Sequence, residues 1–235
     1  MAAIEFALIA PIFAMLMIGV YDISVAVTLN QEVSNAAHTI PTSASTLAVQ
    51  PDDTTTLTVT QVQQVLSGIY AAMPMLRNGA AAGIHSATLT SVSFQQSDPQ
   101  CVASSTTACP YLAYAKWSVS YAEPTGRPLS SGTGFTSVSR CQAAGTPLRQ
   151  VTPAQYTPGD LTSLPTAAVS APDPILVADI HYQYTPLFYN FITGPIDFWA
   201  IGLWPVRTAS LSAPAQNQYT TYDLANAAGG VGQCP

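Results

Sequence analysis

Charged residues are scarce in this sequence, and cations are both few and late. Charged residues make up 8% of the 235 residues, against about 25% in an average soluble protein. Lysine occurs once, at Lys116, and the first lysine or arginine of the sequence is Arg77. The formal net charge is -6, and the basic clusters that bind a phosphate backbone are missing. This composition argues against a nucleic-acid partner.

Motifs for catalysis and metal binding are also missing. The sequence has no Gly-x-Ser-x-Gly elbow, no His-Glu-x-x-His pair and no glycine-rich phosphate loop. The histidines His38, His85 and His181 are scattered, whereas metal ligands recur at fixed spacings. Asp179 with His181 is the nearest acid–base pair; two residues apart on an expected strand, they share a face, as a surface pair also would. We expect no enzyme, no cofactor and no metal site.

Four cysteines are present, and none belongs to a Cys-x-x-Cys pair: Cys101, Cys109, Cys141 and Cys234. An even number favours two disulfides, for which three pairings exist. We favour Cys101 with Cys109, which closes a short loop, and Cys141 with Cys234, which ties the tail to the middle of the chain. Disulfides persist in oxidising compartments. The cysteines therefore predict a periplasmic or cell-surface location.

The chain opens with a long apolar run. Residues 6–21 carry no charge, a single acid, Glu5, precedes them, and Asp22 follows. As a helix this run is about 24 Å long, slightly short of a bilayer core of ~30 Å. Extension to Leu29 supplies the missing length and places Asp22 near the membrane boundary. Because a basic flank normally orients a membrane segment, we expect that a basic leader has been removed.

Between Ala2 and about residue 39, only Pro11 interrupts the helical pattern. Pro11 removes one backbone donor, so it either kinks the helix or is accommodated by its neighbours. The front of this helix is apolar all round, which suits a membrane or a filament core. Further along, apolar residues recur at helical spacing between polar ones: Val25, Leu29, Val33, Ala36, Ala37 and Ile40. We therefore predict an N-terminal helix over residues 1–40 whose rear packs on a head.

Residues 41–235 are predicted to form an extracytoplasmic α+β head. A polar connector from Pro41 to Thr56 leads into an expected amphipathic helix over residues 58–73, which stops before a proline. Four period-two runs predict strands: Thr88–Phe94, Tyr111–Tyr121, Ile175–Tyr184 and Val206–Ala213. The expected architecture is a small antiparallel sheet with a covering helix and long loops.

Two stretches of the head lack a clear pattern. Pro, Gly, Ser and Thr dominate residues 123–174, which predicts a long loop of the kind that is often functional. The aromatic stretch Pro186–Pro205 is broken by Pro195 and Asp197, so it is a poor transmembrane span. We interpret it as a connection between the last two strands, in the core or at a subunit interface, with the membrane interface as the alternative.

The N-terminal segment resembles a known family. The run Ala-Ile-Glu-Phe-Ala-Leu, followed by Pro11, Gly19 and Asp22, is similar to the start of TadE-like pseudopilins of the tight-adherence (Tad, or Flp) type IV pili. The resemblance covers about 40 residues, with a weaker echo over 177–212. It implies a minor pilin or pseudopilin that is stored in the inner membrane and self-associates, or joins other pilins, in a filament at the cell surface through the pilus assembly machinery. A non-polymerising membrane-anchored periplasmic assembly factor and a tip adhesin remain as alternatives.

The expected subunit contacts lie at the start of the helix: Met1, Glu5, Phe6, Pro11 and Asp22. The resemblance implies that the Glu5 carboxylate pairs with the N-terminal amine of an adjoining subunit. Such a pair makes physical sense, because an ionised carboxylate among apolar helices is costly unless it is paired. It requires Met1 to be a processed N-terminus rather than an initiator. Alternatively, Glu5 lies in the headgroup layer, favoured there by the helix dipole.

Overall fold

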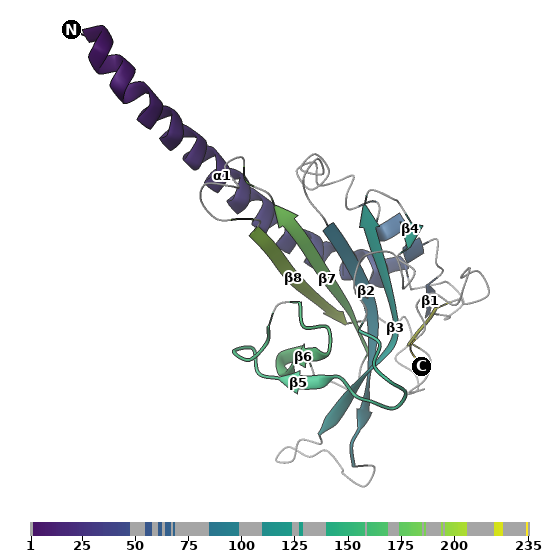
Figure 1. Ribbon diagram of the computed structural model, residues 1–235. Helices are drawn as coiled ribbons and strands as arrows, with labels where there is room; N and C mark the ends of the chain where they lie inside the picture. The colour runs from purple at the N-terminus through teal and green to yellow at the C-terminus, as the bar shows by residue number, and fades with distance from the viewer. Residues whose placement is uncertain are drawn as a thin grey trace.

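The structure is a computed structural model, and it describes residues 2–47, 55–57, 61–62, 64–66, 68, 85–98, 110–123, 127–128, 140–157, 159–168, 174–184, 186, 194, 196–205, 219–222 and 234. One long helix projects from a head that is built on an antiparallel sheet (Figure 1). The N-terminus lies at the free end of this helix, away from the sheet. The predicted α+β fold class is therefore confirmed.

Helix α1 spans Ala2–Leu47 and is longer than the sequence predicted. We expected the helix to end near Ile40 and a connector to begin at Pro41, but Pro41 lies inside the helix. The connector prediction is wrong for residues 41–47. Ala44 is as fully buried as Ile40, and both lie in the core between α1 and the sheet. Continued burial of this helix face stabilises the last turns despite the backbone bond that proline removes.

Five strands form the central sheet in the order β4-β3-β2-β7-β8, and all neighbours are antiparallel. Three of the four predicted strands correspond to strands of this sheet; one has the predicted bounds, and the other two are longer than predicted. The bounds are β2 (His85–Gln96), β3 (Tyr111–Glu123), β4 (Arg127–Pro128), β7 (Ile175–Tyr184) and β8 (Ile196–Pro205).

Strand β8 lies within the aromatic stretch that we interpreted as a connection. That interpretation is wrong for residues 196–205, which pair with β7 along their whole length. Pro195 directly precedes the strand and Asp197 is its second residue, and a sheet tolerates proline and charge at a strand end on its edge. The strand predicted at Val206–Ala213 lies outside the described residues.

Strand β8 and helix α1 approach each other closely at Gly202. A β-carbon at this position would overlap the carbonyl oxygen of Ala37, so glycine is what allows the two backbones to come this near. The same carbonyl lacks its usual helical donor, because Pro41 has no N–H. A glycine in the strand and a proline in the helix therefore meet at one carbonyl group.

Each face of the sheet carries its own hydrophobic core. On one face, the buried side of α1 packs against residues that include Leu89 and Tyr182. On the other face, the segment 140–168 packs against residues that include Val92 and Val177. Figure 1 shows α1 behind the sheet and this segment in front of it. The sheet is thus the middle layer of the head.

Strand β3 contributes to both cores because it contains an extra residue. Its pairing with β2 passes from Trp117 directly to Ala115, so Lys116 has no partner in β2, which is the pattern of a β-bulge. The period-two run predicted over Tyr111–Tyr121 would place Ala113 and Trp117 on one face. The bulge instead directs Trp117 to the core under α1 and Ala113 to the opposite core.

The segment predicted as one long loop is partly regular. A small parallel sheet and a 3-10 turn lie within it: β5 (Arg149–Val151), β6 (Ser163–Pro165) and η2 (Thr166–Ala168). The prediction of a loop without structure over residues 123–174 is therefore wrong for residues 140–168. Leu148 and Leu164 are almost fully buried, and they attach the segment to the sheet.

The remaining described elements are a second, two-stranded sheet and a short helical stretch. Strands β1 (Thr55–Leu57) and β9 (Tyr219–Tyr222) pair in parallel as a separate two-stranded sheet. The described residues among 61–68 are helical, and Val62 and Leu66 are buried in the core under α1. This agrees with the amphipathic helix predicted over 58–73, whose ends lie outside the described residues.

Candidate functional site

The front half of α1, residues 6–28, has a largely exposed apolar surface, in contrast to the rear half, residues 29–47. Leu29, the first residue of the rear half, is only 2% exposed. Apart from the half-buried Ile18 and Val25, the large apolar side chains described in the front half are 53–74% exposed: Phe6, Ile9, Ile12, Phe13, Met15, Leu16, Met17, Val20, Tyr21, Ile23 and Val27. An apolar surface of this extent marks an interaction site with lipid or protein.

By length and composition, α1 could cross a membrane. The candidate span is Ile9–Thr46, with a mean hydropathy of 2.1, and only 6% of its most apolar window is buried inside the protein. The front half alone is about 34 Å long at 1.5 Å per residue, which exceeds a hydrocarbon core of ~30 Å. The front half therefore has both the length and the surface of a membrane anchor.

Polar side chains of the front half have partners within the chain. The Tyr184 hydroxyl at the end of β7 donates to Asp22 Oδ1 at 3.1 Å. Ser24 donates to the carbonyl of Val20 at 2.8 Å, and Thr28 donates to the carbonyl of Ser24 at 2.9 Å. Burial and the bond to Asp22 raise the pKa of Tyr184 to about 12, so this hydroxyl remains a donor at neutral pH. Satisfied polar groups can enter an apolar environment at much lower cost.

The predicted subunit-contact residues are spread along the front half. Phe6 is 74% exposed and Pro11 is also exposed, so both are accessible to a neighbour. Asp22 is half-buried and bonded to the head, which the sequence did not predict. Met1 and the side chain of Glu5 lie outside the described residues, so their pairing stays a prediction.

A comparison with protein families identifies this helix. Residues 1–40 match the family model of TadE-like proteins. The match confirms that this segment resembles TadE-like proteins. The TadE-like segment ends inside the rear half of α1, so the sheet lies beyond it. No curated protein sequence and no solved structure matches the chain.

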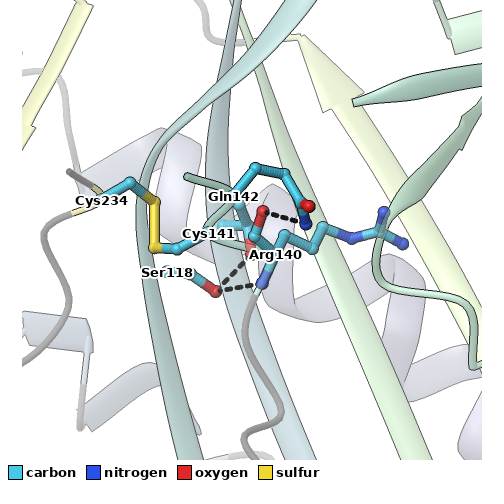
Figure 2. Close-up of a disulfide and its surroundings, with 6 residues drawn as sticks. Ser118, Arg140, Cys141, Gln142 and Cys234 are labelled. Carbon is cyan, nitrogen blue, oxygen red and sulfur yellow. Dashed lines mark hydrogen bonds between the residues drawn. A yellow bond between two sulfur atoms is a disulfide. The ribbon is translucent and has the colours of Figure 1, made fainter. Parts of the chain in front are cut away.

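Beyond the TadE-like segment, a disulfide fastens the end of the chain to the sheet. Cys141 and Cys234 are bonded (Figure 2), the pairing that we favoured from the sequence. The backbone N–H of Cys234 donates to the carbonyl of Lys116 at 3.1 Å, at the bulge of β3. The bulge thus provides an acceptor for the tail. Cys101 and Cys109 lie outside the described residues.

A buried arginine next to this disulfide was not foreseen from the sequence. Arg140 is 0% exposed and binds Asp179 through two nitrogens, with Nε–Oδ2 at 2.6 Å and Nη2–Oδ1 at 2.7 Å. It also donates to the carbonyl of Ser163, and its own N–H donates to the Ser118 hydroxyl. Burial lowers the pKa of Arg140, but the charge and bonds of Asp179 outweigh this and raise it. The pair fixes the segment 140–168 on the sheet.

Asp179 and His181 lie on the same face of β7 but do not form a pair. Asp179 is 3% exposed and binds the arginine, so the surface-pair interpretation is wrong for it. His181 Nε2 lies 2.9 Å from Asp197 Oδ1, and its ring stacks on Trp199 at 3.8 Å between centroids. Gly159 covers Trp199 from the segment 140–168. Asp179 therefore attaches the segment 140–168 to β7, whereas His181 connects β7 to β8.

Within the described part of the chain, no group of three or more His, Cys, Asp or Glu residues is arranged to hold a metal ion. Several described carboxylates bind arginine, histidine, glutamine, tyrosine or threonine side chains instead. Arg149 Nη2, for example, lies 2.9 Å from Asp160 Oδ2. A hydrogen bond from the Thr162 hydroxyl lowers the pKa of Asp160 to about 2, so this carboxylate is ionised at neutral pH. Among the described features, the exposed apolar surface of the front half of α1 is the one that points to a binding function.

Proposed function

We propose that this chain is a minor pilin or pseudopilin of a Tad/Flp pilus, a structural subunit that assembles through the front half of α1. The observation that carries the proposal is an exposed apolar rod, residues 6–28, on a chain whose residues 1–40 match TadE-like proteins. Before assembly the rod lies in the inner membrane with the head in the periplasm. After assembly it packs among the helices of other subunits, and the head faces outward at the cell surface.

The physical chemistry of the rod supports storage in lipid followed by transfer. Burial of large apolar side chains contributes roughly 1.5–3 kcal/mol each when the alternative is water. The gain is small when the alternative is lipid, because lipid tails are as apolar as the neighbouring helices. Extraction of the subunit from the bilayer therefore requires work from the pilus assembly machinery, with which this chain interacts.

Glu5 is the residue proposed to set the register between subunits. It lies directly before the apolar rod, and the chain has no lysine or arginine before Arg77 to neutralise it. The N-terminal amine of a neighbouring copy is a cation available at every subunit, and its pairing with Glu5 offsets the cost of a buried carboxylate. Each incoming helix is then aligned by one charge pair.

Replacement of Glu5 by glutamine tests this function. In Glu5→Gln the side chain keeps its size and loses its charge, so the amount of protein in sheared surface filaments should fall strongly while the membrane-bound pool persists. Glu5→Asp, the matched control, keeps the charge and should retain part of the filament yield. Normal yield and length of filaments in Glu5→Gln would refute the proposed register pair.

The rival function is a membrane-anchored assembly factor that never polymerises. The bond between Asp22 and Tyr184 favours it to some degree, because it occupies an acid that we expected at the subunit contact. Fractionation separates the two functions. A pilus subunit appears in high-mass sheared material, whereas an anchored factor remains entirely with the membranes. A role as tip adhesin is tested with substitutions on the surface of the head. Deletion of residues 140–168 is unsuitable, because it would remove one of the two cores of the head.

A further inference from the structure

Helix α1 connects its exposed half to the head without a break. It is one helix from Ala2 to Leu47, and its rear half packs on β7 and β8. No loop separates the rod from the sheet, so the orientation of the rod fixes the orientation of the head. If the rod spans a bilayer, as the proposed function requires before assembly, the sheet must lie at a defined height above it.

One end of the sheet lies beside the helix where the rod leaves the head. In Figure 1 the tip of β7 and the start of β8 lie next to α1 at this point. Tyr184, at the tip of β7, binds Asp22. Tyr184, Phe198 and Val25 are partly buried side chains that pack on the edge of the core under α1. The end of the sheet is therefore level with residues 22–25 of the helix.

This level falls at the boundary of a bilayer. Asp22 follows Phe6 by 16 residues, or about 24 Å along a helix, whereas the hydrocarbon core is ~30 Å thick. A rod that begins to span at Phe6 would still be inside or at the edge of the hydrocarbon at Asp22. The tip of β7 and the start of β8 cannot avoid the headgroup layer in that arrangement.

The side chains at this end suit the headgroup layer. Tyrosine is enriched at membrane interfaces because its ring is apolar and its hydroxyl is polar. Neither β7 nor β8 contains a lysine or arginine. Asp197 is exposed, and His181 and Gln183 bind its carboxylate. A contact made by such a surface depends on aromatic and apolar groups and not on attraction to anionic lipids.

We propose that the β7–β8 end of the head, with Tyr184 and Phe198, is a second membrane contact that rests in the headgroup layer of a phospholipid bilayer. The inference rests on the membrane-spanning state of the rod in the proposed function. It adds that the head lies directly on the membrane instead of standing away from it. The bond between Tyr184 and Asp22 sets the depth of this contact. Zwitterionic and anionic phospholipids both serve as the partner.

Photocrosslinking of the full chain in lipid vesicles tests the contact. A benzophenone amino acid replaces Phe198 in one variant, the exposed mid-rod residue Phe13 in a second, and Gln95 in a third. Gln95 is exposed and lies near the far end of β2. The other end of β2, at His85, pairs with Tyr182 and is therefore the end close to Tyr184. The vesicles contain phosphatidylcholine alone or phosphatidylcholine with phosphatidylglycerol, and intact mass reports lipid adducts after illumination.

We expect lipid adducts at position 13 and at position 198, with yields at 198 several-fold above those at 95 and equal in the two lipid mixtures. Adducts at 13 with only background yield at 198 would overturn this inference alone and leave the membrane-spanning rod intact. Background yield at 13 would overturn both. Crosslinks from 198 to a second copy of the chain, without lipid adducts, would identify this end as a subunit interface and also overturn the inference. Yields at 198 that require phosphatidylglycerol would contradict the aromatic basis of the contact.

Discussion

The two halves of α1 belong to one continuous helix and have opposite surroundings. The front half presents bulky side chains, such as Phe13 and Met15, that are more than 60% exposed. The rear half buries large side chains, such as Leu29 and Ile40, together with small ones, such as Ala37. Small residues let the helix approach the sheet backbone, and large ones offer side-chain area to lipid or to neighbouring helices. Contact with the sheet, and not hydrophobicity alone, separates the part that folds with the head from the part that binds elsewhere.

The largest expected effect is at the point where the rear half meets the sheet. In Gly202→Ala the new methyl group would overlap the carbonyl of Ala37, and backbone atoms on both sides cannot move aside easily. We expect the free energy of unfolding of the head to fall by roughly 3 kcal/mol or more, at the upper end for overpacked sites. Denaturant unfolding in detergent, followed by tryptophan fluorescence, measures this change.

The same substitution in the front half provides the control. Gly19 has open space around its α-carbon, with no atom within 4 Å of an added methyl group. Gly19→Ala should leave the head's stability unchanged and strengthen the helix by up to about 1 kcal/mol. Equal losses of stability in the two alanine variants would contradict the division of α1 into a packed and an unpacked half.

A charge in the front half should have the next largest effect, on insertion and not on folding. Met15 is 62% exposed and lies in the middle of the apolar rod. Met15→Lys should weaken membrane insertion by about 2.5–3.5 kcal/mol, while the head keeps its stability. Carbonate extraction of membranes measures the insertion. Asn35→Lys, at an exposed position of the rear half, is the matched control and should remain fully membrane-bound.

The sequence was sufficient to predict the helix and most of the sheet, because their patterns are local. An uncharged apolar run followed by helical spacing from Val25 to Ile40 predicts a rod with one packed face, and the structure has both. Period-two runs predict β2, β3 and β7. The end of α1 was missed because proline at 41 is a local signal to stop, whereas the burial of Ala44 that overrides it comes from a distant strand.

Strand β8 and the β3 bulge show a second limit of local patterns. The apolar residues of β8 alternate between the two faces, with Phe198 and Ala200 toward α1 and Ile201 and Leu203 toward the opposite core. A strand that is apolar on both faces does not show the polar alternation that identifies half-buried strands. The bulge at Lys116 reverses the faces of β3 without any glycine or proline to mark it.

The pair between Arg140 and Asp179 is the part of the head that sequence reasoning had the least chance to find. The residues are 39 positions apart, and each looks like an ordinary surface charge. One signal exists in retrospect. Asp179 stands in the apolar run of β7, where a buried carboxylate requires a cation, and the sequence offers only six lysines and arginines in total. A search over so few candidates would have included Arg140.

The smallest expected effect concerns the one front-half side chain that the structure shows bonded to the head. Tyr184→Phe removes the hydroxyl that donates to Asp22 at 3.1 Å and leaves the ring in place. We expect a loss of about 1 kcal/mol in the free energy of unfolding, since a bond to a charged group contributes somewhat more than a neutral one but Asp22 is only half-buried. Asp22→Asn alone should have a similar effect.

A double-mutant cycle decides whether this bond joins the halves. If the hydroxyl and the carboxylate act on each other, Tyr184→Phe combined with Asp22→Asn should cost less than the sum of the single changes, with a coupling of roughly 0.5–1 kcal/mol. Strict additivity of the two losses of stability would mean that Asp22 acts elsewhere, for example on a neighbouring subunit. The packed half of α1 would then begin at Leu29. Coupling would instead place the first contact between rod and head at Asp22, within the apolar run, so that the two halves overlap by about two turns of helix.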